Sequence, residues 1–261
     1  MKKITIMTPC YNEEGNIEDL YLRVKEVFNQ LPNYEYEHLF IDNASQDKTV
    51  DELKKIAQKD PGIKVIVNAR NFGPVRSGYY GILQCYGDAV IPIVADLQDP
   101  PELILEFVKK WEEGYKVVKA FKTPMKEGSF FYFARQIFYY LMDNLSDIKI
   151  TRNFTGFGLY DQKVINVLRE INDPYPYFRG LIEELGFESF SFEYQQQRRK
   201  RGISSYNFYR YYSDAMLGIT SHSQVPLRLA TMLGFTLSLL SLLVALGYLI
   251  AKLLFWDYFP L

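Results

Sequence analysis

The chain has 261 residues, which is enough for one sizeable domain with an appendage. Its formal net charge of -1 argues against a nucleic-acid-binding surface, which needs a clear excess of Lys and Arg. Two cysteines and two histidines are too few for a disulfide framework or for a metal site built on these residues. Cys10 and Cys85 are therefore expected to be buried packing residues in a reducing compartment.

Strand and helix patterns alternate through the first half of the chain, which starts directly in a strand pattern and not in an apolar leader segment. The predicted strands cover residues 4–8, 36–41, 62–68 and 89–95, and the predicted helices end near residues 31, 59 and 85, with a fourth beginning near residue 102. This alternation is typical of a parallel sheet covered by helices on both faces. Each strand ends in polar residues, so we expect these ends to converge on one crevice.

The stretch after the fourth strand carries the strongest chemical signal. Asp96, Gln98 and Asp99 follow an apolar run and precede Pro100 and Pro101, which stop the strand. Oxygen ligands suit Mg²⁺ or Mn²⁺, and such ions commonly complete their shell with substrate phosphates. The sequence alone leaves a second interpretation open, in which the acids form an ordinary turn before the next helix.

The C-terminal region differs in kind from the rest. Residues 229–251 contain no charged residue and, as a helix of about 23 residues, would span roughly 34 Å, enough to cross a bilayer. The flanking basic residues place the preceding side in the cytoplasm; they are Arg198, Arg199, Lys200, Arg201, Arg210 and Arg228, against Lys252 alone. Trp256, Tyr258 and Phe259 fit an aromatic belt at the far interface. The alternative is a buried core helix.

Residues 206–225 mix aromatic and apolar side chains with Arg210, Asp214 and serines. This pattern favours helices that lie flat at the level of the lipid headgroups. The alternative is an ordinary amphipathic helix that packs on the preceding domain. We therefore expect a cytoplasmic domain over residues 1–200, interfacial helices over 201–225, a membrane span over 226–255 and a far-side tail over 256–261.

Several motifs together resemble family 2 glycosyltransferases with the GT-A fold, an α/β fold with a mostly parallel, Rossmann-like sheet. They are T-P-C-Y-N-E-E, I-D-N-A-S-Q-D, R-N-F-G, A-D-L-Q-D-P-P, T-G-F-G-L-Y-D, F-R-G-L, Y-x4-R-x2-G-x-S-x-Y and S-x-S-x2-P-L-R-L. The similarity is greatest to the branch that includes dolichol-phosphate mannose synthases and bacterial polyprenyl-phosphate glycosyltransferases, and it covers nearly the whole chain. Members of the bacterial branch usually have two membrane helices, and this sequence stops after one.

The resemblance implies roles for individual residues. The nucleotide contacts would be Pro9, Tyr11, Glu13, Asp42, Asn71, Ser204 and Tyr206, and the metal ligands Asp96 and Gln98, with Asp99 supporting them. Arg199 would close on the diphosphate and act in catalysis with Asp96 and Arg135. A turn tyrosine, helix-capping acids and a basic face near anionic lipid are the alternatives for these positions.

The residues that would bind the acceptor phosphate are chosen by their position in the chain. Lys119, Lys122 and Arg135 lie beyond the metal-binding strand and near the aromatic segment 130–141. That segment fits equally an interfacial helix that supports a lipid tail and a core helix of the domain.

Five positions depart from the family pattern. Val94 replaces the first aspartate of D-x-D, which predicts weaker metal affinity, and Asn43 and Ala44 replace the more usual Asp-Gly. Ser205 stands where a lysine is frequent, and Gly156 where relatives often have an aspartate suggested as a base. A sugar hydroxyl needs a base, whereas a phosphate monoester, with a second pKa of about 6, is mostly dianionic at neutral pH. The absence of an aspartate base at position 156 therefore favours a lipid-phosphate acceptor.

The expected function is inverting, metal-dependent transfer of a sugar from a nucleotide sugar to a polyprenyl phosphate such as undecaprenyl phosphate. A UDP-sugar is the favoured donor, although the residues do not choose between uracil, guanine and thymine. The expected location is the inner membrane, with the catalytic domain facing the cytoplasm, and the family also implies homo-oligomers. Two rivals remain: a membrane-anchored scaffold, and a sugar-polymerising enzyme, whose Q-x-x-R-W motif here has Arg199 in place of tryptophan.

Overall fold

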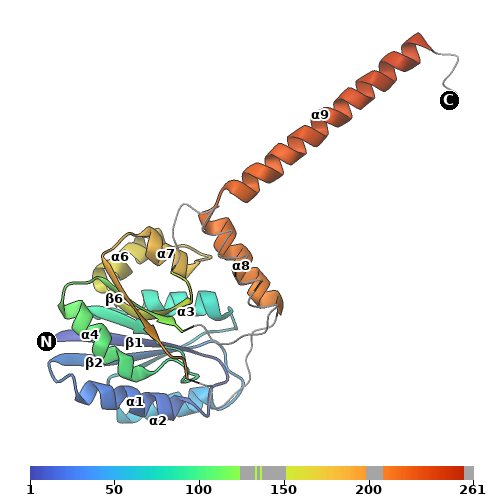
Figure 1. Cartoon of the computed structure of the whole chain (residues 1–261). Helices are drawn as coiled ribbons and strands as arrows, with labels where there is room; N and C mark the ends of the chain where they lie inside the picture. Colours follow the sequence, from blue (N-terminus) through green and yellow to red (C-terminus); the bar gives the residue numbers. More distant parts are fainter. Residues whose placement is uncertain (124–132, 134–135, 137–150, 198–207, 256–261) are drawn as a thin grey trace.

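The computed structural model describes residues 1–123, 133, 136, 151–197 and 208–255 (Figure 1). The strands are β1 (Lys2–Cys10), β2 (Tyr34–Asp42), β3 (Ile63–Val67), β4 (Ala89–Pro92), β5 (Val117–Lys122), β6 (Phe154–Asp161) and β7 (Ser189–Tyr194). The helices are α1 (Ile17–Asn29), α2 (Thr49–Lys59), α3 (Pro74–Leu83), α4 (Ile104–Glu112), α6 (Gln162–Ile171), α7 (Phe178–Glu184), α8 (Phe208–His222) and α9 (Val225–Leu254), with a 3₁₀ turn over Pro101–Leu103.

The strands of the described part form one sheet in the order β3-β2-β1-β4-β6-β5-β7. The first four strands are parallel, β6 runs antiparallel to its neighbours β4 and β5, and β7 is parallel to β5. Buried side chains from α1, α2 and α4 pack on one face, and those from α3, α6 and α7 pack on the other. These observations confirm the predicted mostly parallel sheet with helices on both faces.

The fourth strand is shorter than its apolar pattern indicates. Its ladder ends at Pro92, which pairs with Met7, and one further bond runs from the Ile93 N–H to the Met7 carbonyl at 2.9 Å. Ile93 and Ala95 remain buried, while Val94 is 40% exposed. Residues 93–95 therefore begin the loop that the sequence had assigned to the strand.

The long helix α9 has none of its residues buried against the domain. It contains 30 residues and is about 45 Å long, and its most apolar window has a mean hydropathy of 2.2. A core helix would be covered by other elements, so this alternative is wrong. Among the described residues, α9 is the one helix long and apolar enough to cross a membrane.

Helix α8 connects α9 to the domain by packing its C-terminal end on α7. His222 Nδ1 lies 3.3 Å from Glu184 Oε2, and the His222 ring lies 5.7 Å from the ring of Tyr177. A β-carbon at Gly218 would lie 3.0 Å from the Tyr177 ring, so the backbone approaches closely here. Tyr209, Tyr212 and Met216 on α8 stay exposed. The C-terminal end of α8 thus packs on the domain, and the interfacial position of the helix stays a prediction.

The imidazole of His38 is fully buried between two hydroxyl-bearing side chains. Its Nε2 lies 2.9 Å from Thr8 Oγ1 and its Nδ1 lies 3.3 Å from the hydroxyl of Tyr36. The ring also stacks on Phe40, with 3.9 Å between centroids. Burial lowers the pKa of His38 from 6.5 to about 3, so the ring is neutral in the folded chain at neutral pH.

We predict that His38 makes the fold sensitive to acid. Because its folded-state pKa is lower than its ordinary value, the unfolded chain binds more protons between these two values, and stability falls as the pH drops. Between about pH 7 and about pH 5 this one group should lower the free energy of unfolding by about 2 kcal/mol. Urea titrations of the detergent-solubilised chain should detect this loss, and His38→Gln should remove most of it. An equal loss in the variant would contradict the assignment.

Candidate active site

The loops after β1 and β2 are joined by hydrogen bonds between backbone and side chains. The Asn12 N–H donates to Ser45 Oγ at 2.9 Å, and the Glu13 N–H donates to Thr49 Oγ1 at 2.8 Å. In the opposite direction, Asn12 Oδ1 accepts from the Gln46 N–H at 2.8 Å. These bonds satisfy backbone donors that belong to no ladder, so the two loops form one unit.

Asn43 links this unit to the loop after β3. Its Nδ2 donates to Asn71 Oδ1 at 2.9 Å, and its Oδ1 accepts from the Phe72 N–H at 2.9 Å and from Asn68 Nδ2 at 3.3 Å. Asn71 Oδ1 also accepts from the Gly73 N–H at 2.8 Å. The sequence had identified Asn43 only as a departure from the family aspartate. Its amide can donate, which an ionised carboxylate cannot do.

Asp42 is buried at the end of β2, whereas Tyr11, in the loop after β1, is exposed. The Asp42 carboxylate is fully buried, and its two oxygens accept from the backbone N–H and the hydroxyl of Ser45. Tyr11 is 37% exposed, which leaves its ring accessible to a base. Glu13 Oε2 accepts from Asn16 Nδ2 at 2.6 Å, and Pro9 pairs with Ile41 in the sheet. The structure thus brings these four predicted residues together, and their contact with a nucleotide stays a prediction.

The predicted metal ligands lie on a tight turn after β4. Leu97 has a φ of 60°, and its buried side chain holds this conformation against a cost of about 1–2 kcal/mol. The backbone N–H of Gln98 donates to Asp96 Oδ1 at 3.1 Å, which closes the turn, and the side-chain Nε2 of Gln98 lies 3.5 Å from the Gln197 carbonyl. Met7 pairs with Pro92, and Tyr11 and Asp96 lie equally far along the chain past this pair. Because β1 and β4 are parallel, this turn and the loop after β1 follow the same edge of the sheet.

The chain after β7 holds this turn from the other side. The Tyr194 hydroxyl donates to Asp99 Oδ1, and the Lys122 ammonium lies 3.9 Å from the same oxygen. Burial raises the pKa of the Asp99 carboxyl, an effect that Lys122 and Tyr194 oppose. The Gln197 N–H donates to the Gln98 carbonyl at 3.0 Å. Asp99 thus supports the turn and Lys122 lies beside it, while the predicted roles of Asp99 at a metal and of Lys122 at an acceptor phosphate stay predictions.

Lys119 is a correction to the predicted acceptor site. Its side chain is 5% exposed, and its ammonium lies 2.9 Å from Glu183 Oε2 on α7 and 3.3 Å from Thr151 Oγ1. An ammonium that is buried and paired in this way is committed to a structural ion pair. Its assignment to an acceptor phosphate was wrong. Arg135, Arg199, Ser204 and Tyr206 lie outside the described residues.

Two departures from the family pattern have a backbone explanation. Gly156 has a φ of 97°, and a β-carbon there would lie 3.3 Å from the Phe178 ring. This conformation strongly disfavours an aspartate in the present backbone. Ala44 has a φ of 62°, so it takes the conformation for which glycine is usual.

The donor set suits a hard divalent cation that is shared with a ligand. No group of three or more His, Cys, Asp or Glu side chains is gathered for a metal within the described ranges. The turn offers the Asp96 carboxylate and the Gln98 amide, and phosphate oxygens commonly complete such a shell.

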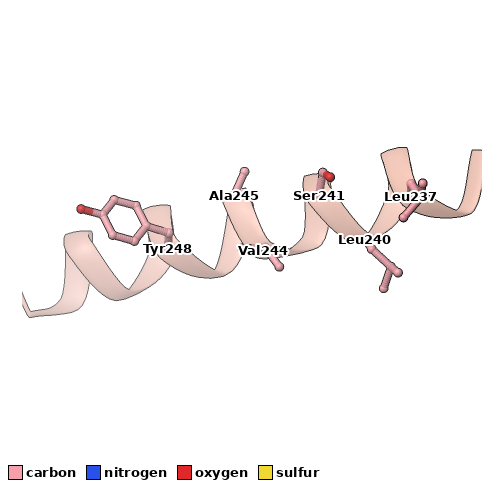
Figure 2. Close-up of a pocket in the computed structure, with 6 residues that line it drawn as sticks. All are labelled: Leu237, Leu240, Ser241, Val244, Ala245 and Tyr248. Carbon is pink, nitrogen blue, oxygen red and sulfur yellow. The ribbon is translucent and has the colours of Figure 1, made fainter. Parts of the chain in front are cut away.

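A shallow concavity elsewhere lies along α9 between Leu237 and Tyr248 (Figure 2), on one exposed apolar helix and not at the strand ends.

A fold of this kind, with polar loops joined at the carboxyl ends of parallel strands, is that of a nucleotide-binding α/β protein. Residues 5–169 match the family model for Glycosyl transferase family 2. The chain therefore belongs to glycosyltransferase family 2.

Two curated relatives and one solved structure illustrate the similarity. The "Uncharacterized glycosyltransferase YkcC" of Bacillus subtilis (strain 168) is 38% identical over 90% of this chain and 72% of its own. The "Bactoprenol glucosyl transferase" of Shigella phage SfV is 33% identical over 98% of this chain and 83% of its own. The mannosyltransferase PcManGT from Pyrobaculum calidifontis, solved with GDP-Man and Mn²⁺, has a TM-score of 0.55 at 15% identity and covers 82% of this chain and 60% of its own. That structural likeness confirms the GT-A fold.

We predict that Asn43→Asp separates the loops after β2 and β3. The variant removes the donor to Asn71 Oδ1 and sets two oxygens against each other, which should cost about 1–3 kcal/mol of stability. Chemical denaturation would measure this cost. Asn33→Asp makes the same change in an exposed loop and should have little effect. If both variants lose the same stability, Asn43 is not the link between the loops.

Proposed function

We propose that this chain transfers a sugar from a nucleotide sugar to the phosphate of a polyprenyl phosphate lipid at a membrane surface. The observation that carries the proposal is the combination of the oxygen-donor turn at the strand ends with an uncovered apolar helix on the same chain. The phage relative that matches 98% of this chain is named a bactoprenol glucosyl transferase, which supports the same substrates.

The donor side of the reaction is assigned to the joined loops and the turn after β4. Tyr11 would stack on the base, and Pro9, Glu13, Asp42 and Asn71 would shape the nucleotide pocket. Asp96 and Gln98 would hold Mg²⁺ or Mn²⁺, which when bound would neutralise charge on the departing diphosphate. The Mn²⁺ in the PcManGT structure supports a divalent ion for this fold. A UDP-sugar is the proposed donor.

The acceptor side needs positive charge more than it needs a base. Position 156 has no side chain to act as a base, and a lipid phosphate already carries the negative charge of a nucleophile. Among the described residues, Lys122, whose ammonium lies beside Asp99, is our candidate for binding that phosphate. Arg135 remains a candidate from the sequence. In-line attack of the phosphate oxygen on the anomeric carbon would invert its configuration.

The membrane placement follows from α8 and α9. We assign α9 as the membrane span, residues 201–225 as the interfacial region and residues 1–200 as a catalytic domain that faces the cytoplasm. The exposed Tyr209, Tyr212 and Met216 on α8 suit the headgroup level. The C-terminal end of α8, which packs on α7, would hold the crevice near the lipid phosphate. The catalytic domain and its acceptor would then meet by diffusion in the plane of the membrane.

We predict that Asp96→Ala reduces turnover by about a hundredfold or more, because the diphosphate loses its bound cation. Calorimetry should show that the variant also loses Mn²⁺-dependent binding of UDP, while its thermal unfolding stays close to that of the parent chain. Asp51→Ala, on the exposed face of α2, is the matched control and should keep both activities. Unchanged UDP binding in the Asp96 variant would refute the metal assignment. A parent chain that binds neither UDP nor Mn²⁺ would favour a membrane-anchored scaffold.

We also predict that the acceptor is a lipid phosphate. Incubation with a radiolabelled UDP-sugar should place label in the chloroform-extractable fraction only when polyprenyl phosphate is added. The free polyprenol is the control, because its hydroxyl would need the base that position 156 does not supply. Equal labelling of the alcohol and the phosphate would contradict the proposed acceptor.

A further inference from the structure

Three arginines on one side of the domain each stack on an aromatic ring. The Arg70 guanidinium lies 4.2 Å from the centre of the Phe72 ring, and the Arg179 guanidinium lies 5.0 Å from that of Tyr177. Arg76 lies between two rings, 5.2 Å from Tyr175 and 5.9 Å from Phe72. The rings fix the planes of the guanidinium groups, and we call Arg70, Arg76 and Arg179 the stacked-arginine surface.

The charges of this surface are not neutralised within the described part of the chain. No Asp or Glu oxygen there lies within 4.0 Å of these three side chains, whereas Arg23 makes a close pair with Glu102 at 2.8 Å. Arg70 donates weakly to the Asn71 carbonyl at 3.4 Å and Arg179 to the Phe154 carbonyl at 3.3 Å. Arg70 and Arg76 are exposed. Most of their N–H donors therefore remain available to an anion.

The position of this surface relates it to the membrane anchor. Tyr177, which stacks on Arg179, also packs against His222 at the end of α8. Helix α9 begins at Val225, shortly after His222. In Figure 1, α7 lies beside this junction, where α9 leaves the domain. If α9 crosses a bilayer, Arg179 lies close to the point at which the helix enters it, and Arg70 and Arg76 extend the surface from there.

We propose that the stacked-arginine surface binds the phosphates of anionic phospholipid headgroups and so fixes the tilt of the domain on the bilayer. Arginine binds phosphate oxygens through two parallel N–H bonds, and the cytoplasmic leaflet has a negative surface potential that attracts such groups. Stacking on Phe72, Tyr175 and Tyr177 reduces the freedom that each side chain loses on binding. The proposal rests on the membrane placement in the proposed function, and not on the transfer reaction.

The experiment measures how close this surface comes to lipid headgroups in the full-length chain. Cys10 and Cys85 are buried, so Pro174→Cys beside Tyr175 would give a single exposed thiol for a fluorescent label. The labelled chain is reconstituted into nanodiscs of phosphatidylcholine, or into discs in which about a third of the lipid is phosphatidylglycerol. Both discs contain a headgroup spin-labelled lipid that quenches fluorescence at short range. We expect stronger quenching in the anionic discs.

Charge reversal should remove this difference. Arg70→Glu together with Arg76→Glu should reduce quenching in the anionic discs to the level seen with phosphatidylcholine. The matched control is Lys54→Glu with Lys59→Glu on α2, which carries the same charge change on the other side of the sheet and should keep the difference. Thermal unfolding of both variants checks that they fold.

Two results would overturn the proposal. One is equal quenching of the parent chain in both kinds of disc. The other is a double arginine variant that keeps the lipid difference but loses Mn²⁺-dependent UDP binding, which would assign the arginines to the nucleotide site. The measurement needs no sugar transfer, so failure of the proposed reaction and failure of this proposal remain distinguishable.

Discussion

The site depends on one constraint, which is that the parallel strands β1, β2 and β3 end at the same edge of the sheet and leave backbone donors that no strand can satisfy. Side chains meet this need: Ser45 and Thr49 accept from the loop after β1, and Asn43 accepts from the loop after β3. A buried donor without a partner lowers the stability of the fold, so each of these bonds restricts the conformations that the loops can take. The proposed nucleotide half of the site is therefore shaped by the same bonds that stabilise the sheet edge.

The proposed metal half of the site is supported differently. Its turn is held by the buried Leu97 side chain and by contacts with the end of β7, where Tyr194 binds Asp99 and Gln197 binds the Gln98 backbone. The neighbouring Asp96 carboxylate adds to the rise in the pKa of Asp99, so negative charge is already concentrated at this turn. A cation would relieve that repulsion, and a second aspartate at position 94 would increase it.

Much of the fold could be predicted from the sequence because apolar residues recur with the periods of strands and helices over residues 4–112. The second half of the sheet could not, because β6 reverses direction and pairs with strands that are distant in the chain. The motif predicted correctly that Asp96 and Gln98 share one turn after β4, and their role as metal ligands stays a prediction. Site prediction failed for Lys119, because the sequence displays its charge but not its partner Glu183. Asn43 was similarly undervalued, since its role depends on Asn71 in another loop.

Gly156 connects the backbone to the choice of acceptor. At a φ of 97° the position is suited to glycine, so this backbone strongly disfavours an aspartate base at that point for a conformational reason. A site without this base favours a nucleophile that arrives already charged, and a lipid phosphate meets that requirement. Such a nucleophile must be brought up to a diphosphate of the same charge, which makes cations and positional restraint the main needs of the reaction. Docking of α8 on α7, with α9 continuing from it, supplies restraint of the kind that this reaction requires.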